Sequence, residues 1–410
     1  MGKDSRPGFR FKDGKLLILA PDAVIIIESW PEITATWAKP GTNRWKPFVP
    51  IFRLLRPPSC RRPRLINDTK NAALGPSSIR SSAVDPDFER QRAFNSFRYT
   101  ISPDVADATE RFRSRQWNVL RVCQRTARGR ELMVINPALG FCLANLDSFR
   151  ATLELPDILA GRVSGMKQRE LLAAMGFPGT ESCARIFSRI IPEAVHVEAL
   201  AHLRDALKAE EAGKFFSHLP RISAGALALV GNPRFLHHVT PNLLSEVASS
   251  EIEDEVPRTA VLLQDLQQMW SVLSPGRPEQ RFQSVASLRG AHFEVSAEYC
   301  AKRRDDILKC QFPAPPLPGT EDIVALTTAQ ELVQEGREQM NCVATYARWV
   351  ETGGGYIYRV LRPERATIAV ERGTDGNWQI QQIRGKHNAE VTEETGRAVE
   401  KWLRDYSVSV

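Results

Sequence analysis

A cysteine at position 342 lies within REQMNCVATYARWV, residues 337–350. The apolar residues here recur at intervals of three and four, which predicts one amphipathic helix from about Thr328 to Val350. On that helix Cys342 lies at the margin of the core stripe, one turn from Tyr346. A cysteine in this position is either a reactive thiol or a small residue that packs and lines a pocket. Both interpretations stay open.

A thiol nucleophile would need a base within hydrogen-bond reach of its sulfur. His387 is the one histidine after residue 320, and the order Cys342, His387, Asn388 resembles that of a cysteine-protease triad. The side chains of adjacent loop residues diverge, however, so His387 and Asn388 suit the roles of base and orienting group poorly. We assign no catalytic residue and keep Cys342 and His387 as the candidates of an alternative function, a nuclease or a thiol-dependent hydrolase with its site around Cys342 and residues 382–388.

A second group of polar residues ends the last expected strand, NWQIQQIRG, residues 377–385. Strand alternation places Trp378 and Ile380 on the same face as Gln382 and Arg384, and the two apolar residues mark that face as covered. Polar side chains on a covered face need partners or line a cavity. We therefore expect a pocket lined by Asn341, Cys342, Tyr346, Gln382, Arg384 and Asn388.

These residues carry a resemblance to the PcfJ-like protein family, which is known from conjugative plasmids and many bacterial genomes. The family signature is a Cys-Val followed by a Tyr, then a Thr-rich strand, then Gln, Arg-Gly and Asn. It falls here on Cys342, Val343, Tyr346, Thr367, Gln382, Arg384, Gly385 and Asn388. The resemblance covers roughly residues 320–405 and implies an accessory protein of plasmids or other mobile elements, with no biochemical activity to carry over.

This chain departs from the family in one respect. The family often has a histidine one or two residues before the cysteine, where this chain has Met340 and Asn341. The departure weakens any role of a neighbouring histidine in activating the thiol or binding a metal.

The order of patterns along the 410 residues predicts an α+β protein. The middle region is mainly α-helical, and a small α-β-β-β-α domain follows, with an antiparallel sheet and helices packed on one face. The expected parts are a short β-rich segment, a basic Pro/Arg-rich linker, a mainly helical domain and the C-terminal domain, at residues 1–46, 47–84, 85–310 and 320–410.

Two local patterns support this division. The segment QFPAPPLPGT, residues 311–320, holds four prolines and is interpreted as a separator before a C-terminal domain that folds alone. Residues 167–190 predict two short helices, with Gly176 in the turn and Thr180 capping the second. Their turn is longer than a DNA-binding helix-turn-helix prefers, so packing within a helical array is favoured.

Charge is distributed unevenly. Residues 1–130 carry 25 Lys and Arg against 12 Asp and Glu, whereas the remaining residues carry 30 against 36. An arginine-rich arm suits phosphate, so DNA or RNA is one expected partner. A solvated basic segment, or one that meets an acidic protein partner, is the alternative. The candidate nucleic-acid contacts are Arg61, Arg62, Arg64, Arg111, Arg113 and Arg115.

The sequence holds no motif typical of several other classes of protein. The seven cysteines include no CxxC pair, which argues against a zinc ribbon or a disulfide framework. No phosphate-binding glycine motif is present, and we expect neither a cofactor nor a metal site. The apolar run at residues 16–27 is too short to span a bilayer, so we expect a cytoplasmic protein without a membrane contact.

Overall fold

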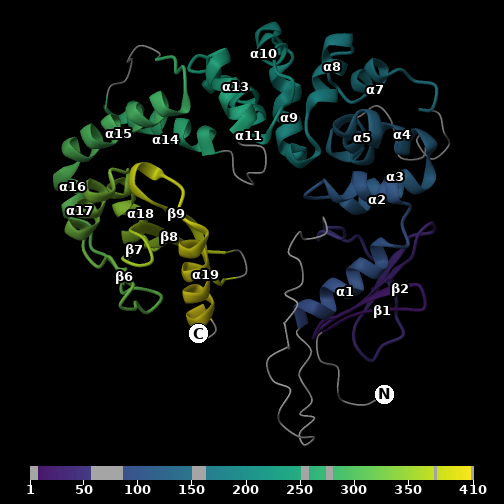
Figure 1. The fold of residues 1–410 in the computed structure, drawn as a ribbon, viewed down its shortest axis with the longest axis horizontal. Helices are drawn as coiled ribbons and strands as arrows, with labels where there is room; N and C mark the ends of the chain where they lie inside the picture. The colour runs from purple at the N-terminus through teal and green to yellow at the C-terminus, as the bar shows by residue number, and fades with distance from the viewer. Residues whose placement is uncertain are drawn as a thin grey trace, which may run out of the picture. The chain divides into compact units, whose positions relative to one another are not determined.

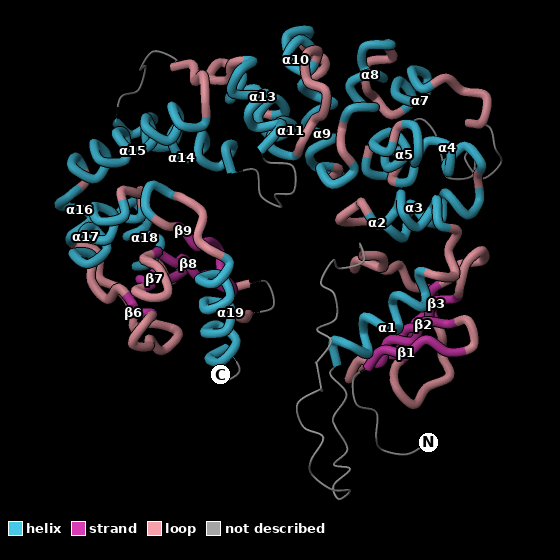
Figure 2. Tube along the Cα trace, viewed as in Figure 1, coloured by secondary structure: helices cyan, strands magenta, loops and turns pink. Residues whose placement is uncertain are grey.

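The computed structural model describes residues 8–56, 86–149, 163–250, 258–273, 280–373 and 376–407 (Figure 1). The chain forms two compact units. The first comprises Met1–Leu236 and Leu244–Pro257, and the second comprises His237–Leu243 and Arg258–Val410. Helices fill most of the first unit, and the second is built around an antiparallel sheet (Figure 2). The α+β class is therefore confirmed.

The first unit begins with an antiparallel sheet whose strands follow one another in chain order. Asp13 and Gly14 both have positive φ, 51° and 72°, and form a tight hairpin turn between its first two strands. Helix α1 (Pro86–Arg98) packs on this sheet. The strands are β1 Gly8–Lys12, β2 Lys15–Leu19, β3 Val24–Glu28, β4 Ala35–Ala38 and β5 Lys46–Pro47.

Short helices make up the rest of the first unit, because caps and prolines repeatedly end one helix and start another. Asn136, for example, accepts a hydrogen bond from Leu139 N just before Pro137 opens the next helix. The elements are α2 Pro103–Glu110, α3 Gln116–Arg125, α4 Ala127–Ile135, α5 Pro137–Ala144, η1 Leu146–Ser148, α7 Gln168–Ala174, α8 Glu181–Arg189, η2 Pro192–Ala194, α9 Val197–Ala206, α10 Glu210–Phe216, α11 Ala224–Gly231 and α12 Pro233–Leu236; α13 Pro241–Ser250 contributes residues to both units.

The two short helices expected within residues 167–190 are α7 and α8. Gly176 has a φ of 79° in the turn between them. Thr180 Oγ1 accepts a hydrogen bond from Cys183 N at 3.2 Å and so caps α8, as the sequence predicted.

The second unit holds a four-stranded antiparallel sheet in the order β6-β7-β8-β9. Its strands are β6 Ile323–Ala325, β7 Gly355–Val360, β8 Ala366–Arg372 and β9 Trp378–Arg384, so β6 adds one strand to the three that were predicted. The helical elements are α14 Arg258–Leu273, α15 Val285–Lys302, α16 Arg304–Leu308, α17 Ala329–Gln339, η3 Val343–Tyr346, α18 Ala347–Glu351, η4 Lys386–Asn388 and α19 Glu393–Ser407.

Helices cover both faces of this sheet, and the prediction of helices on one face was wrong. Tyr358 of β7 packs edge-on against Trp402 of α19, with ring centroids 4.8 Å apart. The next residue, Arg359, points to the opposite face and pairs with Glu335 of α17. The sheet is therefore a middle layer, and each face has its own cover.

The proline-rich segment at 311–320 is part of this layered core rather than a spacer. Leu317 is 1% exposed, and its backbone N–H and carbonyl both bond the hydroxyl of Tyr358, at 3.0 and 2.8 Å. Trp402 Nε1 donates to the carbonyl of Pro318 at 3.0 Å. The separate domain at residues 320–410 stays a prediction, since the compact unit in the structure also takes in this segment and α14–α16.

Candidate functional site at the end of α17

The single helix predicted from Thr328 to Val350 is broken beside the cysteine. Helix α17 ends at Gln339, because the next residue, Met340, adopts a left-handed conformation with φ of 50°. The N–H of Asn341 then bonds the carbonyl of Gly336 at 3.1 Å, which is the hydrogen bond of a Schellman-type helix end. Asn341 Oδ1 accepts from Val343 N at 3.1 Å and starts η3. Cys342 therefore lies at a helix junction rather than within a helix.

A bulge in β9 is the second local departure from the expected pattern. Ala369 pairs with Gln382, but the next residue, Val370, pairs with Ile380, so Gln381 is an extra residue. The bulge moves Gln382 and Arg384 to the face opposite Trp378 and Ile380. The prediction that all four share one face was wrong, and the two polar side chains lie instead on the face that α17 covers.

The junction and the bulge meet at one small cavity, whose enclosed space is about 20 Å³. All six residues expected to line a pocket lie around it. Its lining consists of Asn341, Cys342, Val343, Tyr346, Ile357, Thr367, Ala369, Gln382, Arg384 and Asn388. The structure thus brings the expected residues together, and what the cavity binds is a matter for proposal.

Polar contacts fix two of the groups around this cavity. Gln382 Nε2 donates to Tyr346 Oη at 3.5 Å, which joins β9 to η3. Arg384 Nη1 lies 3.4 Å from a carboxylate oxygen of Glu390, and Arg258 pairs with the same oxygen. Two guanidinium groups therefore share one carboxylate, and one of them, that of Arg384, belongs to a residue that lines the cavity.

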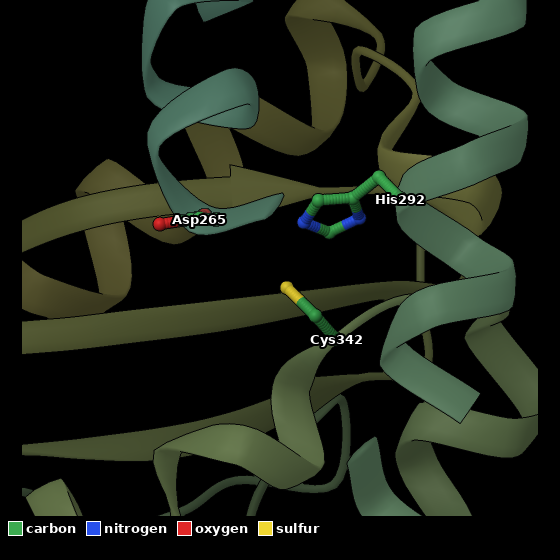
Figure 3. Close-up of side chains that lie close together, drawn as sticks. All are labelled: Asp265, His292 and Cys342. Atoms are coloured by element: carbon green, nitrogen blue, oxygen red, sulfur yellow. The ribbon is translucent and has the colours of Figure 1, made fainter. Parts of the chain in front are cut away.

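Cys342 also belongs to a cluster with Asp265 of α14 and His292 of α15 (Figure 3). One ligand atom from each residue lies within 4.8 Å of the other two. Figure 3 shows the distal nitrogen of the His292 ring on the side of Asp265, with the Cys342 sulfur directed at the ring. His292 is 2% exposed, and its Nε2 is buried without a hydrogen-bond partner among the described residues. Burying an unpaired group of this kind costs about 1–3 kcal/mol.

Desolvation opposes charge on every member of the cluster. Burial raises the pKa of Asp265 to about 6 and lowers that of His292 to about 4. Burial, with a smaller effect from the Asp265 carboxylate, raises the pKa of Cys342 to about 12. Burial likewise raises the pKa of Tyr346, with smaller effects from Cys342 and Asp265. At neutral pH the thiol is therefore protonated and is a poor nucleophile.

His387, the other sequence candidate, lies elsewhere. It is exposed in η4, where its ring meets Phe293 with centroids 6.1 Å apart, and it is not among the residues that line the cavity. The histidine that approaches Cys342 is His292, which the sequence analysis did not select. The sequence did hold a signal for it. His292 falls on the stripe of buried residues of α15, where a polar side chain requires a hydrogen-bond partner or a ligand.

The arginines proposed to contact nucleic acid belong to the first unit. Arg61, Arg62 and Arg64 lie outside the described residues. Arg111 pairs with Glu193 at 3.0 Å, Arg113 is half-buried, and Arg115 is exposed just before α3.

A buried carboxylate holds α17 in place beside the cavity. Glu335 of α17 is 0% exposed and accepts hydrogen bonds from Arg359 at 2.6 Å, Arg365 at 2.6 and 2.9 Å, and Thr367 at 2.7 Å. Because Thr367 also lines the cavity, this network links the helix before Cys342 to the cavity wall.

Comparisons with known proteins agree with the resemblance noted in the sequence. Residues 310–400 match the family model described as PcfJ-like protein. No curated protein and no solved structure match the chain. None of the helices in the described part of the chain has the length and apolar character that crossing a bilayer requires. The C-terminal region of this chain, residues 310–400, is therefore similar to PcfJ-like proteins.

Proposed function

We propose that the second unit is a hydrolase whose reaction takes place in the cavity beside Cys342. One observation carries the proposal. The side chains of Asp265, His292 and Cys342 lie close together, and Cys342 also lines this cavity. Desolvating three such groups together is unfavourable, and clusters of this kind occur preferentially at functional sites. Most of the residues that carry the PcfJ-like resemblance line the same cavity, which is further support.

The presence of Arg384 in the cavity lining favours a substrate with an anionic group. Arg384 and Arg258 both pair with the carboxylate of Glu390. A phosphate oxygen would make a charge-assisted hydrogen bond with the Arg384 guanidinium. The enclosed space, about 20 Å³, holds little more than one water molecule, so the cavity can enclose the attacking water but not the phosphoester itself.

Water is the nucleophile in this proposal, because burial disfavours a free thiolate at Cys342. The oxygen of water forms a new bond to phosphorus, and the bond from phosphorus to the leaving oxygen breaks. The leaving oxygen keeps the electron pair and takes one proton from the water. No residue is consumed, and no redox partner is needed.

Arg384→Ala is expected to lower kcat/KM for hydrolysis of p-nitrophenyl phosphate or bis(p-nitrophenyl) phosphate about 10- to 100-fold, the value of one charge-assisted hydrogen bond. The matched control is Arg372→Ala, since Arg372 lies on the opposite face of the same sheet, over the ring of Trp378. The control should hydrolyse both esters at the wild-type rate. A wild-type protein that hydrolyses neither ester would contradict the proposal.

Nucleic-acid binding by the first unit is a second candidate function, supported by the surplus of arginine in residues 1–130. A further observation favours it: an open hollow of about 980 Å³ between α7 and α8 carries three basic side chains. Its lining is Lys167, Gln168, Arg169, Glu181, Ala184, Arg185 and Ser188.

Two triple variants locate any such binding. We expect Arg61, Arg62 and Arg64 changed to Ala to reduce the salt dependence of DNA or RNA affinity by roughly one unit of slope per lost phosphate contact. The same change at Lys167, Arg169 and Arg185 tests the hollow, and fluorescence anisotropy at several salt concentrations measures both. If the intact protein binds neither nucleic acid at low salt, this candidate function is excluded.

A further inference from the structure

We infer that Asp265, His292 and Cys342 form a binding site for a divalent transition-metal ion, and that Zn²⁺ suits it best. The inference deepens the proposed function, since it names the group that would activate water in the same site. Metal binding by these three residues can nevertheless be measured without any assay of hydrolysis.

The positions of the three ligand atoms support a shared ion. The atoms lie within 4.8 Å of one another. Around a tetrahedral zinc, ligands at bonding distance are separated by about 3.3–3.8 Å, so small side-chain movements close the triangle. The three residues come from α14, from α15 and from the junction after α17, so the fold rather than a local motif gathers them.

The histidine gives independent support. Its Nε2 is buried and has no hydrogen-bond partner among the described residues, although the imidazole is almost fully enclosed. Figure 3 shows the distal ring nitrogen facing the space between Asp265 and the sulfur. A metal ion at that point would use the lone pair of this nitrogen and remove the cost of leaving it unpaired.

The same geometry argues against a Cys-His-Asp nucleophilic triad. In a triad the imidazole holds the nucleophile at one nitrogen and the carboxylate at the other, so sulfur and carboxylate oxygen lie roughly 6 Å or more apart. Here the Cys342 sulfur and the Asp265 oxygen lie within 4.8 Å of each other. Three atoms that converge on one point form a ligand set rather than a proton relay.

The donor types select the class of metal. Thiolate and imidazole favour zinc over magnesium and calcium, which prefer sites made of oxygen atoms alone. On binding, the Cys342 thiol forms a sulfur–zinc bond and releases its proton to solvent. Three protein ligands leave a fourth position for water, as in catalytic zinc sites. Because Cys342 also lines the cavity, that position is adjacent to the place where a substrate would bind.

The test is a calorimetric titration of metal-free full-length protein with Zn²⁺ alone. We expect one Zn²⁺ per chain, and affinity at least about 100-fold weaker in His292→Ala and in Asp265→Asn. Two matched controls should bind like wild type. His238→Gln removes a buried histidine whose Nδ1 already bonds Gln280 O at 2.8 Å, and Cys310→Ser removes a buried thiol outside the cluster.

Thermal unfolding shows whether each variant is folded. If His292→Ala does not fold, Asp265→Asn provides the test of Zn²⁺ binding. Absence of Zn²⁺ binding in wild type, or equal binding in the folded ligand variants, would overturn the inference. The proposed function is tested separately. If the protein binds Zn²⁺ through these residues but hydrolyses neither phosphoester, the metal site is supported and the hydrolase proposal is contradicted. If the metal-free protein still hydrolyses a phosphoester, the hydrolase proposal is supported and a role of the metal in hydrolysis is contradicted.

Discussion

Glu335→Ala should destabilise the second unit by about 3–5 kcal/mol, because it removes one partner from a buried ionic network. The Glu335 carboxylate is fully enclosed and holds two guanidinium groups and the Thr367 hydroxyl. Without it, Arg359 and Arg365 lose their shared partner on the covered face of the sheet. Native-state hydrogen exchange of β8 amides measures the change in the free energy of local opening.

Glu338→Ala is the matched control, since Glu338 lies on the same helix and also pairs with Arg365, at 3.1 Å, but from an exposed position. Exposed ion pairs contribute about 0–1 kcal/mol, so this variant should change the same free energy by no more than that. Equal effects of the two variants would show that burial of the Glu335 network contributes nothing beyond a surface ion pair.

Trp402→Ala should cost about 3–5 kcal/mol, the usual loss for deleting a buried aromatic side chain. The Trp402 ring is 4% exposed and packs edge-on against Tyr358, while its Nε1–H holds the carbonyl of Pro318. The deletion therefore opens a void between α19 and the sheet and releases the proline-rich segment from α19. Urea denaturation and exchange of β7 amides report the loss.

Trp402→Phe separates the two contributions. It keeps an aromatic ring against Tyr358 but removes the hydrogen bond to Pro318, so a loss of about 1 kcal/mol is expected. If Trp402→Ala costs no more than Trp402→Phe, the ring does not hold α19 on the sheet as we describe.

The cavity could be predicted from sequence because its polar members follow signals that act over short distances. Gln382 and Arg384 end a strand, and Cys342 precedes Tyr346 in an amphipathic pattern that also carries the family resemblance. Patterns of this kind identify which elements carry polar side chains on covered faces. They select six of the residues that line the cavity, even though the predicted continuous helix and the predicted regular strand were both wrong.

Those two errors have a common cause. Each prediction takes its period as uninterrupted, 3.6 residues for the helix and 2 residues for the strand. In the structure a single residue interrupts each period. Met340 takes a left-handed conformation that ends α17, although nothing in its chemistry demands this. Gln381 is the additional residue of the β9 bulge, and Ile383 beyond it still faces the core. Tertiary contacts, rather than local propensity, decide such interruptions.

Asp265 and His292 could not be paired with Cys342 from sequence, because 50 or more residues separate each of them from it. Each is one of several polar residues on its helix, a pattern that a packed histidine or a surface carboxylate shows equally well. Packing of α14 against α15, and of α15 against η3, brings them together.

X-ray absorption at the zinc edge of the loaded wild-type protein tests the central claim, a metal centre formed by Asp265, His292 and Cys342, most directly. We expect one sulfur neighbour at about 2.3 Å and nitrogen or oxygen neighbours at about 2.0–2.2 Å, with the sulfur contribution absent from Cys342→Ala. A spectrum with nitrogen and oxygen neighbours only, or one that keeps its sulfur in Cys342→Ala, would contradict it.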